Sequence, residues 1–235
     1  MKKLIILLYI FSILLQAKIT DYDIKPSNLK SSTFMNIKIL DSKELQLNEY
    51  KDIKVSELSA LAYKNNILYA LSDSGYMYHF DIEIKDKKII TLNINKALKL
   101  KNKKNKKLKN KKKDAEGMAF MNDKLLISFE RIPRVELYSL KGIKKKNIKI
   151  NKELKYTNNY QSKNRALESV AYNEEYGVIT APESPLKNSS KQLDNYHILY
   201  AKNRIWKFPI DGKITALEFI NKHKTSAILE KLHLL

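Results

Sequence analysis

Three stretches of this sequence share one pattern, and this internal repeat constrains the fold more than any other feature. They are residues 59–73 (SALAYKNNILYALSD), 116–130 (EGMAFMNDKLLISFE) and 168–183 (ESVAYNEEYGVITAPE). Their first residues lie 57 and then 52 positions apart. A period near fifty residues, built from short alternating strands, is typical of the blades of a β-propeller.

Each copy of the repeat predicts an antiparallel hairpin. An apolar strand leads to turn-forming Asn, Asp or Gly residues near the middle of the copy, and a second apolar strand follows. We therefore expect hairpins over residues 58–72, 116–130 and 168–181. At about 50 residues per blade, the chain has room for about four blades. The expected fold class is all-β, a β-propeller that is incomplete at its end.

The C-terminal region predicts how the third blade ends. Residues 204–210 (RIWKFPI) and 214–220 (ITALEFI) read as two strands that are joined by a hairpin turn at Asp211 and Gly212. Residues 221–235 open a further hairpin without completing it. This pattern indicates a shortened form of a longer propeller protein.

The ends of the predicted strands carry acidic residues. Side chains on directly paired strand ends lie roughly 5 Å apart, so Glu116 is expected beside Glu130, and Glu168 beside Glu183. Asp73 closes the first copy in the same position. Because blades are arranged radially, these carboxylates would meet at one rim of the central channel. Such acids can be ordinary solvated turn residues, but like charges gathered at one rim repel and raise each other's pKa unless a cation or protons relieve them.

The N-terminus predicts export. MKK is followed by an apolar run from Leu4 to Ala17, which is the pattern of a signal peptide over residues 1–17. The run is shorter than the roughly 20 residues of a membrane span, and an uncleaved N-terminal anchor is the alternative. We expect a periplasmic or secreted protein whose propeller-like domain covers residues 18–235. The chain contains no Cys, so it forms no disulfide.

The net charge of +20 is concentrated in one segment. Residues 96–113 hold eleven lysines and no acid. Such a run repels itself and predicts a solvated, poorly ordered insertion between blades. It contains no aromatic residue that could stack on a base, so we expect no nucleic-acid partner. Membrane contact is expected only through the signal segment, or weakly through these lysines toward anionic lipid or a cell-wall polymer.

The repeat motifs also resemble a known family. The residues DAEGMAF (114–120) and LLISFER (125–131), with LESVAY (167–172) and SALAY…ALSDSG (59–75), are similar to those of the phytase-like family, exported bacterial proteins described by an esterase-like activity of phytase. The resemblance covers roughly residues 50–220. It implies a β-propeller and hydrolysis of phosphoesters or related esters assisted by Ca²⁺, as in the distantly similar β-propeller phytases.

The resemblance also implies site residues at the matching positions. Glu130 and Arg131 would be catalytic. Judged by chemistry alone, Arg131 could hold a phosphate in fork geometry, and Arg134 and Arg165 are weaker substrate-binding candidates. The alternative for Arg131 is a salt bridge to a carboxylate of a neighbouring blade. Ca²⁺ takes six to eight oxygen ligands. The residues implied to bind it are Asp73, Asp114, Glu116, Glu130, Glu168 and Glu183.

Two classes of function follow. The first is a monomeric, Ca²⁺-assisted hydrolase of a small phosphoester or ester substrate. The second is a non-catalytic binding or scaffold propeller whose acidic rim holds structural calcium or a basic ligand. The sequence has no G-x-S-x-G motif, so a standard serine esterase is not expected. The fold alone does not decide between the two classes.

Overall fold

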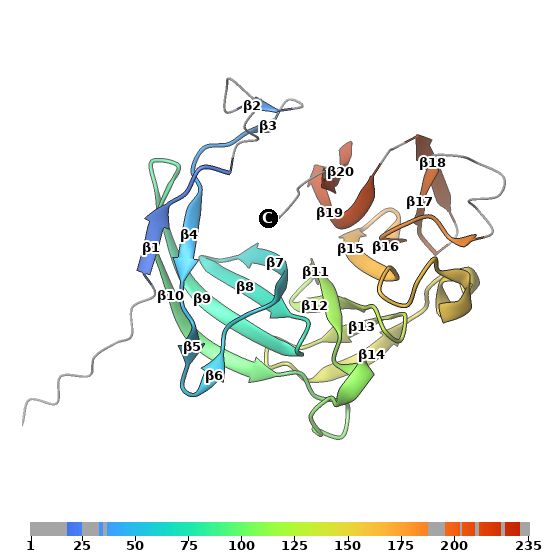
Figure 1. Cartoon of the computed structure of the whole chain (residues 1–235), viewed down its shortest axis with the longest axis horizontal. Coiled ribbons are helices and arrows are strands. Elements are labelled where there is room, and N and C mark those ends of the chain that lie inside the picture. The colour runs from blue at the N-terminus through green and yellow to red at the C-terminus, as the bar shows by residue number, and fades with distance from the viewer. Residues whose placement is uncertain are drawn as a thin grey trace, which may run out of the picture.

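In the computed structural model, the strands form blade-like sheets that follow one another in an arc around a common centre (Figure 1). The structure describes residues 18–24, 33–34, 37–187, 196–202, 204–209, 212–221 and 224–230. Three sheets have four antiparallel strands each, and a further antiparallel hairpin follows them. The expected all-β, propeller-type architecture is confirmed. The predicted signal peptide lies outside the described residues.

Each blade is a meander in which consecutive strands are neighbours. Blade 1 comprises β7 (Leu58–Lys64), β8 (Ile67–Ser72), β9 (Tyr76–Lys85) and β10 (Lys88–Lys99). Blade 2 comprises β11 (Ala115–Met121), β12 (Lys124–Phe129), β13 (Arg134–Tyr138) and β14 (Lys144–Ile148). Blade 3 comprises β15 (Leu167–Asn173), β16 (Gly177–Pro182), β17 (Tyr196–Tyr200) and β18 (Ile205–Pro209). The hairpin of the fourth unit comprises β19 (Lys213–Asn221) and β20 (Lys224–Glu230).

Shorter elements surround the blades. The N-terminal strands form pairs, and β1 also contacts β10 of blade 1; the pairs are β1 (Lys18–Asp21) with β4 (Lys43–Gln46), β2 (Thr33–Phe34) with β3 (Ile37–Lys38), and β5 (Glu49–Tyr50) with β6 (Ile53–Lys54). Three short 3-10 helices are η1 (Asn110–Lys112), η2 (Lys152–Lys155) and η3 (Thr157–Asn159). No helix in the part of the chain that the structure describes is long and apolar enough to cross a membrane.

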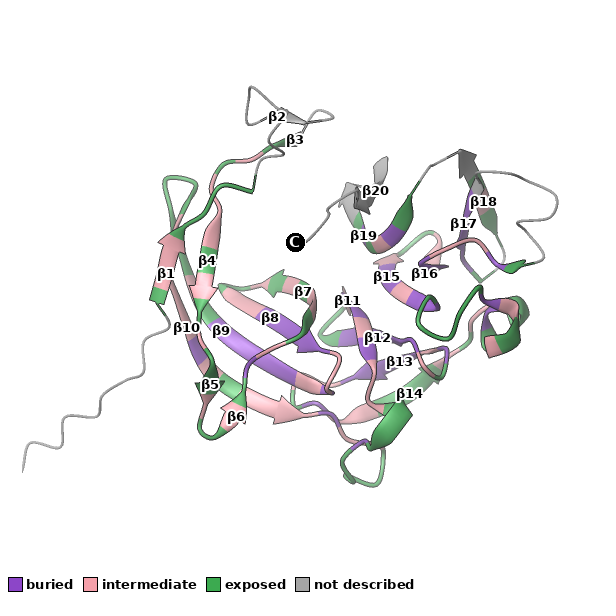
Figure 2. Cartoon of the chain, in the orientation of Figure 1, coloured by how far each residue is buried: buried purple, intermediate pink, exposed green. Residues whose placement is uncertain are grey.

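The three predicted hairpins are the first two strands of blades 1, 2 and 3. Their turns lie at the predicted positions because Asn65, Asn66, Asn122 and Gly177 adopt the positive φ that these turns need. The second strand of each hairpin is buried along most of its length (Figure 2). Burial on both faces explains why these strands read as nearly continuous apolar runs in the sequence.

The hydrophobic core lies between adjacent blades. One cluster joins blade 1, through Leu71 and Met77, to Ile127 and Phe129 of blade 2. A second cluster joins blades 2 and 3, and a third joins blade 3 to the fourth hairpin. Each blade therefore buries its apolar faces against its neighbours, as the layers of a propeller do.

The lysine-rich segment is not the disordered insertion that its composition predicts. Its first part, up to Lys99, belongs to β10. The residues that follow are ordered by backbone hydrogen bonds, such as the one that Leu108 N donates to Leu100 O at 2.9 Å. Leu100 and Leu108 are buried in the cluster between blades 1 and 2. Asn102 organises the turn by accepting backbone hydrogen bonds through Oδ1. Two buried leucines and turn-forming asparagines thus outweigh the mutual repulsion of the lysines.

The C-terminal strands also pair differently from the prediction. β18 is the last strand of blade 3 and pairs with β17, whereas β19 pairs with β20. The predicted hairpin between residues 204–210 and 214–220 is therefore wrong, because the described parts of these two segments belong to different units, β18 to blade 3 and β19 to the fourth. Residues 214–220 open the fourth unit instead of closing the third.

Candidate functional site

The first strand of every unit contains a β-bulge at the same place. The register of each hairpin shifts by one residue, and the extra residue of the bulge is Ser59, Glu116, Glu168 or Thr215. A bulge turns the extra side chain in a new direction. Thr215 shows that β19 carries a fourth copy of the repeat. Its sequence, ITALEF, has Thr at the bulge position where the second and third copies have Glu.

The bulge changes the predicted pairing of the acidic residues. Glu130 N donates to Asp114 O at 3.1 Å, and Glu183 N donates to Ala166 O at 2.8 Å. Each closing acid is therefore bonded to the residue two positions before the bulge, and not to the bulged residue itself. Asp73 N donates to Glu57 O at 3.2 Å in the same way. The acids nevertheless stay at one end of the hairpins.

Six carboxylates gather into two triads at this end, and they are the six residues implied by the resemblance. The first triad crosses from blade 1 to blade 2, and the second from blade 2 to blade 3. Within each triad, one carboxylate oxygen per residue lies within 4.8 Å of the others. The triads, together called the acidic rim, are Asp73, Asp114 and Glu116, and Glu130, Glu168 and Glu183.

Arg131 lies between the two triads. Its Nε donates to Asp114 Oδ2 at 2.8 Å and lies 3.7 Å from Glu130 Oε2. The side chain is 38% exposed, so part of the guanidinium faces solvent. Arg131 is thus an ion-pair partner of the rim, but its partners Asp114 and Glu130 flank strands of its own blade 2, whereas the alternative expected a carboxylate of a neighbouring blade. Its side chain is also part-exposed beside the acids.

Among the described residues, the six carboxyl groups of the acidic rim outnumber the basic side chains that pair with them, Arg131 and Lys213. Burial, together with the nearby charges of Asp114 and Glu130, raises the pKa of Glu116 to about 8. Burial and the charges of Glu116 and Glu130 raise the pKa of Glu168 to about 9. Burial also raises the pKa values of Asp73 and Glu130. Glu116 and Glu168 therefore retain protons at neutral pH that a bound cation would displace.

Glu183 is the most unusual member of the rim. Its Oε1 pairs with Lys213 at 2.5 Å, whereas its Oε2 is buried and has no hydrogen-bond partner among the described residues. A buried carboxylate oxygen without a partner is costly. The sequence analysis missed Lys213, because it placed this residue beside the turn of a different hairpin. The unpartnered oxygen and the all-carboxylate donor set fit a hard cation such as Ca²⁺.

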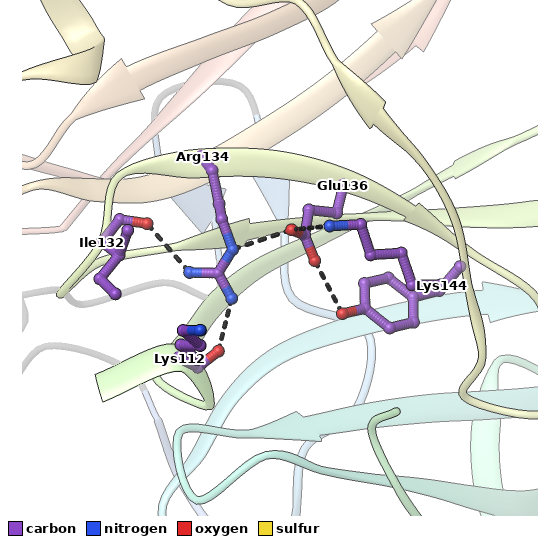
Figure 3. Close-up of polar contacts among 6 residues, drawn as sticks. Lys112, Ile132, Arg134, Glu136 and Lys144 are labelled. Carbon is purple, nitrogen blue, oxygen red and sulfur yellow. Dashed lines mark hydrogen bonds and ion pairs between the residues drawn. The ribbon is translucent and has the colours of Figure 1, made fainter. Parts of the chain in front are cut away.

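Arg134 belongs to a buried hydrogen-bond network and not to the substrate-binding group that the sequence suggested (Figure 3). Its Nε donates to Glu136 Oε1 at 2.9 Å, and its terminal nitrogens donate to the carbonyls of Ile132 and Lys112. Glu136 also accepts from Lys144 and from the Tyr138 hydroxyl.

All three guanidinium nitrogens of Arg134 are thus engaged within blade 2 and by the end of the lysine segment. The guanidinium also stacks at 3.7 Å on the ring of Phe129. This arrangement gives Arg134 a structural role rather than a substrate-binding one. Arg165 is exposed, and its side chain makes no hydrogen bond or ion pair with the described residues. It precedes Ala166, whose N–H donates to Glu130.

A cavity of about 450 Å³ lies between the innermost strands of the four units. Glu116 and Glu168 line it, so the two bulged acids reach the centre of the propeller. Its wall is otherwise mainly apolar and includes Leu61, Met118 and Leu217. Gly117 marks a close approach of blades 2 and 3, because an added Cβ would lie 2.7 Å from Glu168 O.

Comparison with known proteins gives one family and several distant structures. The model of the phytase-like family, described as esterase-like activity of phytase, matches residues 53–228, which include all three repeats and the acidic rim. No curated protein matches this chain.

The similar solved structures share little sequence with this chain. The computationally designed Ika4 protein is 14% identical, with a TM-score of 0.35, over 72% of this chain and 84% of that one. The glutaminyl cyclase of Myxococcus xanthus is 11% identical, with a TM-score of 0.42, over 72% and 62% of the two chains. The Pan2 WD40 domain of Neurospora crassa is 12% identical, with a TM-score of 0.35, over 69% and 41%. This chain therefore spans less than two thirds of the latter two.

Proposed function

This chain belongs to the phytase-like family, and on that premise we propose that it is an exported hydrolase of phosphoesters or related esters that is assisted by Ca²⁺. The observation that carries the proposal is the acidic rim, in which two carboxylate triads from three blades flank one part-exposed arginine. The mainly apolar cavity beside the rim supports a small ester or phosphoester substrate.

The rim residues would hold the cation. Asp73, Asp114 and Glu116 supply one set of oxygens, and Glu130, Glu168 and Glu183 supply the other. A bound Ca²⁺ would supply Lewis-acid polarisation of a phosphoryl or carbonyl oxygen. It would also neutralise the charge that raises the pKa values of the rim carboxylates.

The protein's own groups have separate tasks in this proposal. Arg131 would bind a substrate oxygen through the part of its guanidinium that faces solvent, while its Nε stays on Asp114. Glu130 would exchange a proton with the reacting group, because burial raises its pKa above the ordinary value and so favours a carboxyl group that can give or take a proton. Ala166 N donates to Glu130 Oε1 at 3.4 Å and orients this carboxylate.

The direct test is hydrolysis of p-nitrophenyl phosphate and p-nitrophenyl acetate by the purified chain, with calcium and with a chelator. We expect calcium-dependent hydrolysis that Arg131→Ala lowers by about ten- to a hundredfold, because a charge-assisted hydrogen bond contributes about 1.5–3 kcal/mol. Calcium binding should persist in this variant, since Arg131 supplies no oxygen ligand.

Arg204→Ala is the matched control for this experiment. Arg204 is exposed and lies over the ring of Tyr176, beside the β15–β16 turn and so at the end of this hairpin opposite the rim. Its loss should leave hydrolysis unchanged. Equal losses in both variants would argue against a substrate contact of Arg131.

The second candidate function is a non-catalytic propeller whose acidic rim holds structural calcium. The ion pairs Arg131–Asp114 and Lys213–Glu183 favour it, because they balance part of the rim charge without any substrate. This reading predicts that calcium stabilises the protein while neither ester is hydrolysed. Hydrolysis in the calcium-loaded chain that Arg131→Ala removes would exclude it.

A further inference from the structure

The net charge of this protein belongs almost entirely to two segments. Residues 96–113 and 141–152 together contain seventeen lysines and no acid. The remaining 28 Lys and Arg residues face 25 Asp and Glu residues. The sequence shows the first segment at once, but the second becomes significant only when the fold places it beside the first.

Hydrogen bonds join the two segments into one surface. Lys101 N donates to Gly142 O at 2.8 Å, and Lys144 N donates to Lys101 O at 3.0 Å. The segment before η1 therefore lies along the start of β14, the outermost strand of blade 2 (Figure 1). We call this surface, residues 96–113 and 141–152, the lysine face.

The lysine face is built to display its charges. Leu100 and Leu108 fix the backbone in the core. Asn102 and Asn105 lie in the turn between them and Asn110 follows Leu108, and both Asn105 and Asn110 have positive φ. Seven lysines between residues 103 and 112 are exposed, and Figure 2 shows the same loop and β14 as largely exposed. Lys144 pairs with the buried Glu136, but no ion pair is seen for the seven exposed lysines among the described residues.

We propose that the lysine face docks this protein on the surface of a membrane that carries anionic lipid. A lysine near such a surface is attracted by about 1 kcal/mol, so several together give stable binding. The ammonium group acts as a point charge without the fork geometry that recognises one particular phosphate, which suits a plane of head groups. The proposal is independent of the hydrolase activity.

The composition of the lysine face disfavours a nucleic acid as the partner. The two segments contain no Arg, His, Phe, Tyr or Trp. Base recognition uses Arg forks, and single strands are held by stacking on aromatic rings. A surface of lysines alone offers neither contact.

The test is co-sedimentation of the full chain with phosphatidylcholine vesicles that contain or lack phosphatidylglycerol. The apolar run from Leu4 to Ala17 gives binding that does not depend on lipid charge, so the measured quantity is the difference between the two vesicle types. We expect extra binding to the anionic vesicles that disappears at high salt, since the Debye length falls from about 10 Å at 0.1 M to about 3 Å at 1 M. The variant changes Lys103, Lys104, Lys106 and Lys107 to Gln and should weaken this extra binding by about tenfold or more.

A second variant with the same net charge separates position from total charge. It changes Lys54, Lys85, Lys87 and Lys88 to Gln, which are exposed residues at or near strands of blade 1 and outside the lysine face. This control should keep most of the charge-dependent binding. The proposal is overturned if both variants lose binding equally, if phosphatidylglycerol adds no binding, or if the chain prefers duplex DNA or single-stranded RNA at the same salt.

Discussion

Replacing Arg134 by Met is expected to lower the free energy of unfolding by about 3–5 kcal/mol, the largest change expected from a single substitution here. The substitution would leave Glu136, which is buried, with a charge that Lys144 and Tyr138 only partly satisfy. It would also remove the donors to Ile132 O and Lys112 O. Urea unfolding measures the loss.

Arg165→Met is the matched control for Arg134→Met. The sequence assigned both arginines to substrate binding, yet Arg165 is exposed, and its side chain makes no hydrogen bond or ion pair with the residues that the structure describes. Its substitution should change stability by no more than about 0.5 kcal/mol. The double variant Arg134→Met, Glu136→Met should regain part of the loss, because it removes the buried carboxylate together with Arg134 and leaves only Lys144 without its partner. If Arg134→Met proves as stable as the unaltered chain, the buried network is not the role of Arg134.

Calcium is expected to raise the free energy of unfolding by about 2.7 kcal/mol at a hundredfold excess over its dissociation constant. For a domain of this size, that corresponds to an increase in Tm of about 5–10 °C. Glu130→Gln keeps the shape of the side chain but removes its charge, so it should reduce the calcium-dependent increase. Glu174→Gln, an exposed acid in the β15–β16 turn, should leave the increase intact. If calcium raises the Tm equally in the unaltered chain, in Glu130→Gln and in Glu174→Gln, the calcium is bound at a site other than the acidic rim.

The same carboxylates should make the stability of the calcium-free protein depend on pH. Glu116 and Glu168 have folded-state pKa values of about 8 and about 9, above the ordinary value of 4.5. Between pH 4.5 and pH 9 the folded state therefore binds more protons than the unfolded state, so these two groups make stability fall as pH rises. Glu116→Gln with Glu168→Gln should flatten this dependence in a chelator, and calcium should oppose it in the unaltered chain. A Tm that rises across this range in both proteins would contradict the proposed protonation.

Local signals in the sequence determined the fold class and the three repeat hairpins. Alternating apolar residues set the strands, and Asn or Gly with positive φ set the turns, as at Asn65, Asn122 and Gly177. Because each copy carries its acids at the same strand ends, the sequence also indicated the end of the hairpins at which the carboxylates gather. It did not indicate every neighbour: Glu168 and Glu183 share a triad, whereas Glu116 and Glu130 belong to different ones. These features depend on residues close in the chain, so they can be read without the tertiary structure.

Only the tertiary structure decided how these parts interact. Arg131 and Arg134 are three positions apart, yet one is part-exposed in the acidic rim and the other pairs with the buried Glu136. The bulges at Glu116 and Glu168 shift the pairing by one residue, and the six acids divide into two triads across blade boundaries. Leu100 and Leu108 order the lysine segment only because blades 1 and 2 close over them. Each outcome depends on contacts between segments far apart in sequence, where packing and burial outweigh local preference.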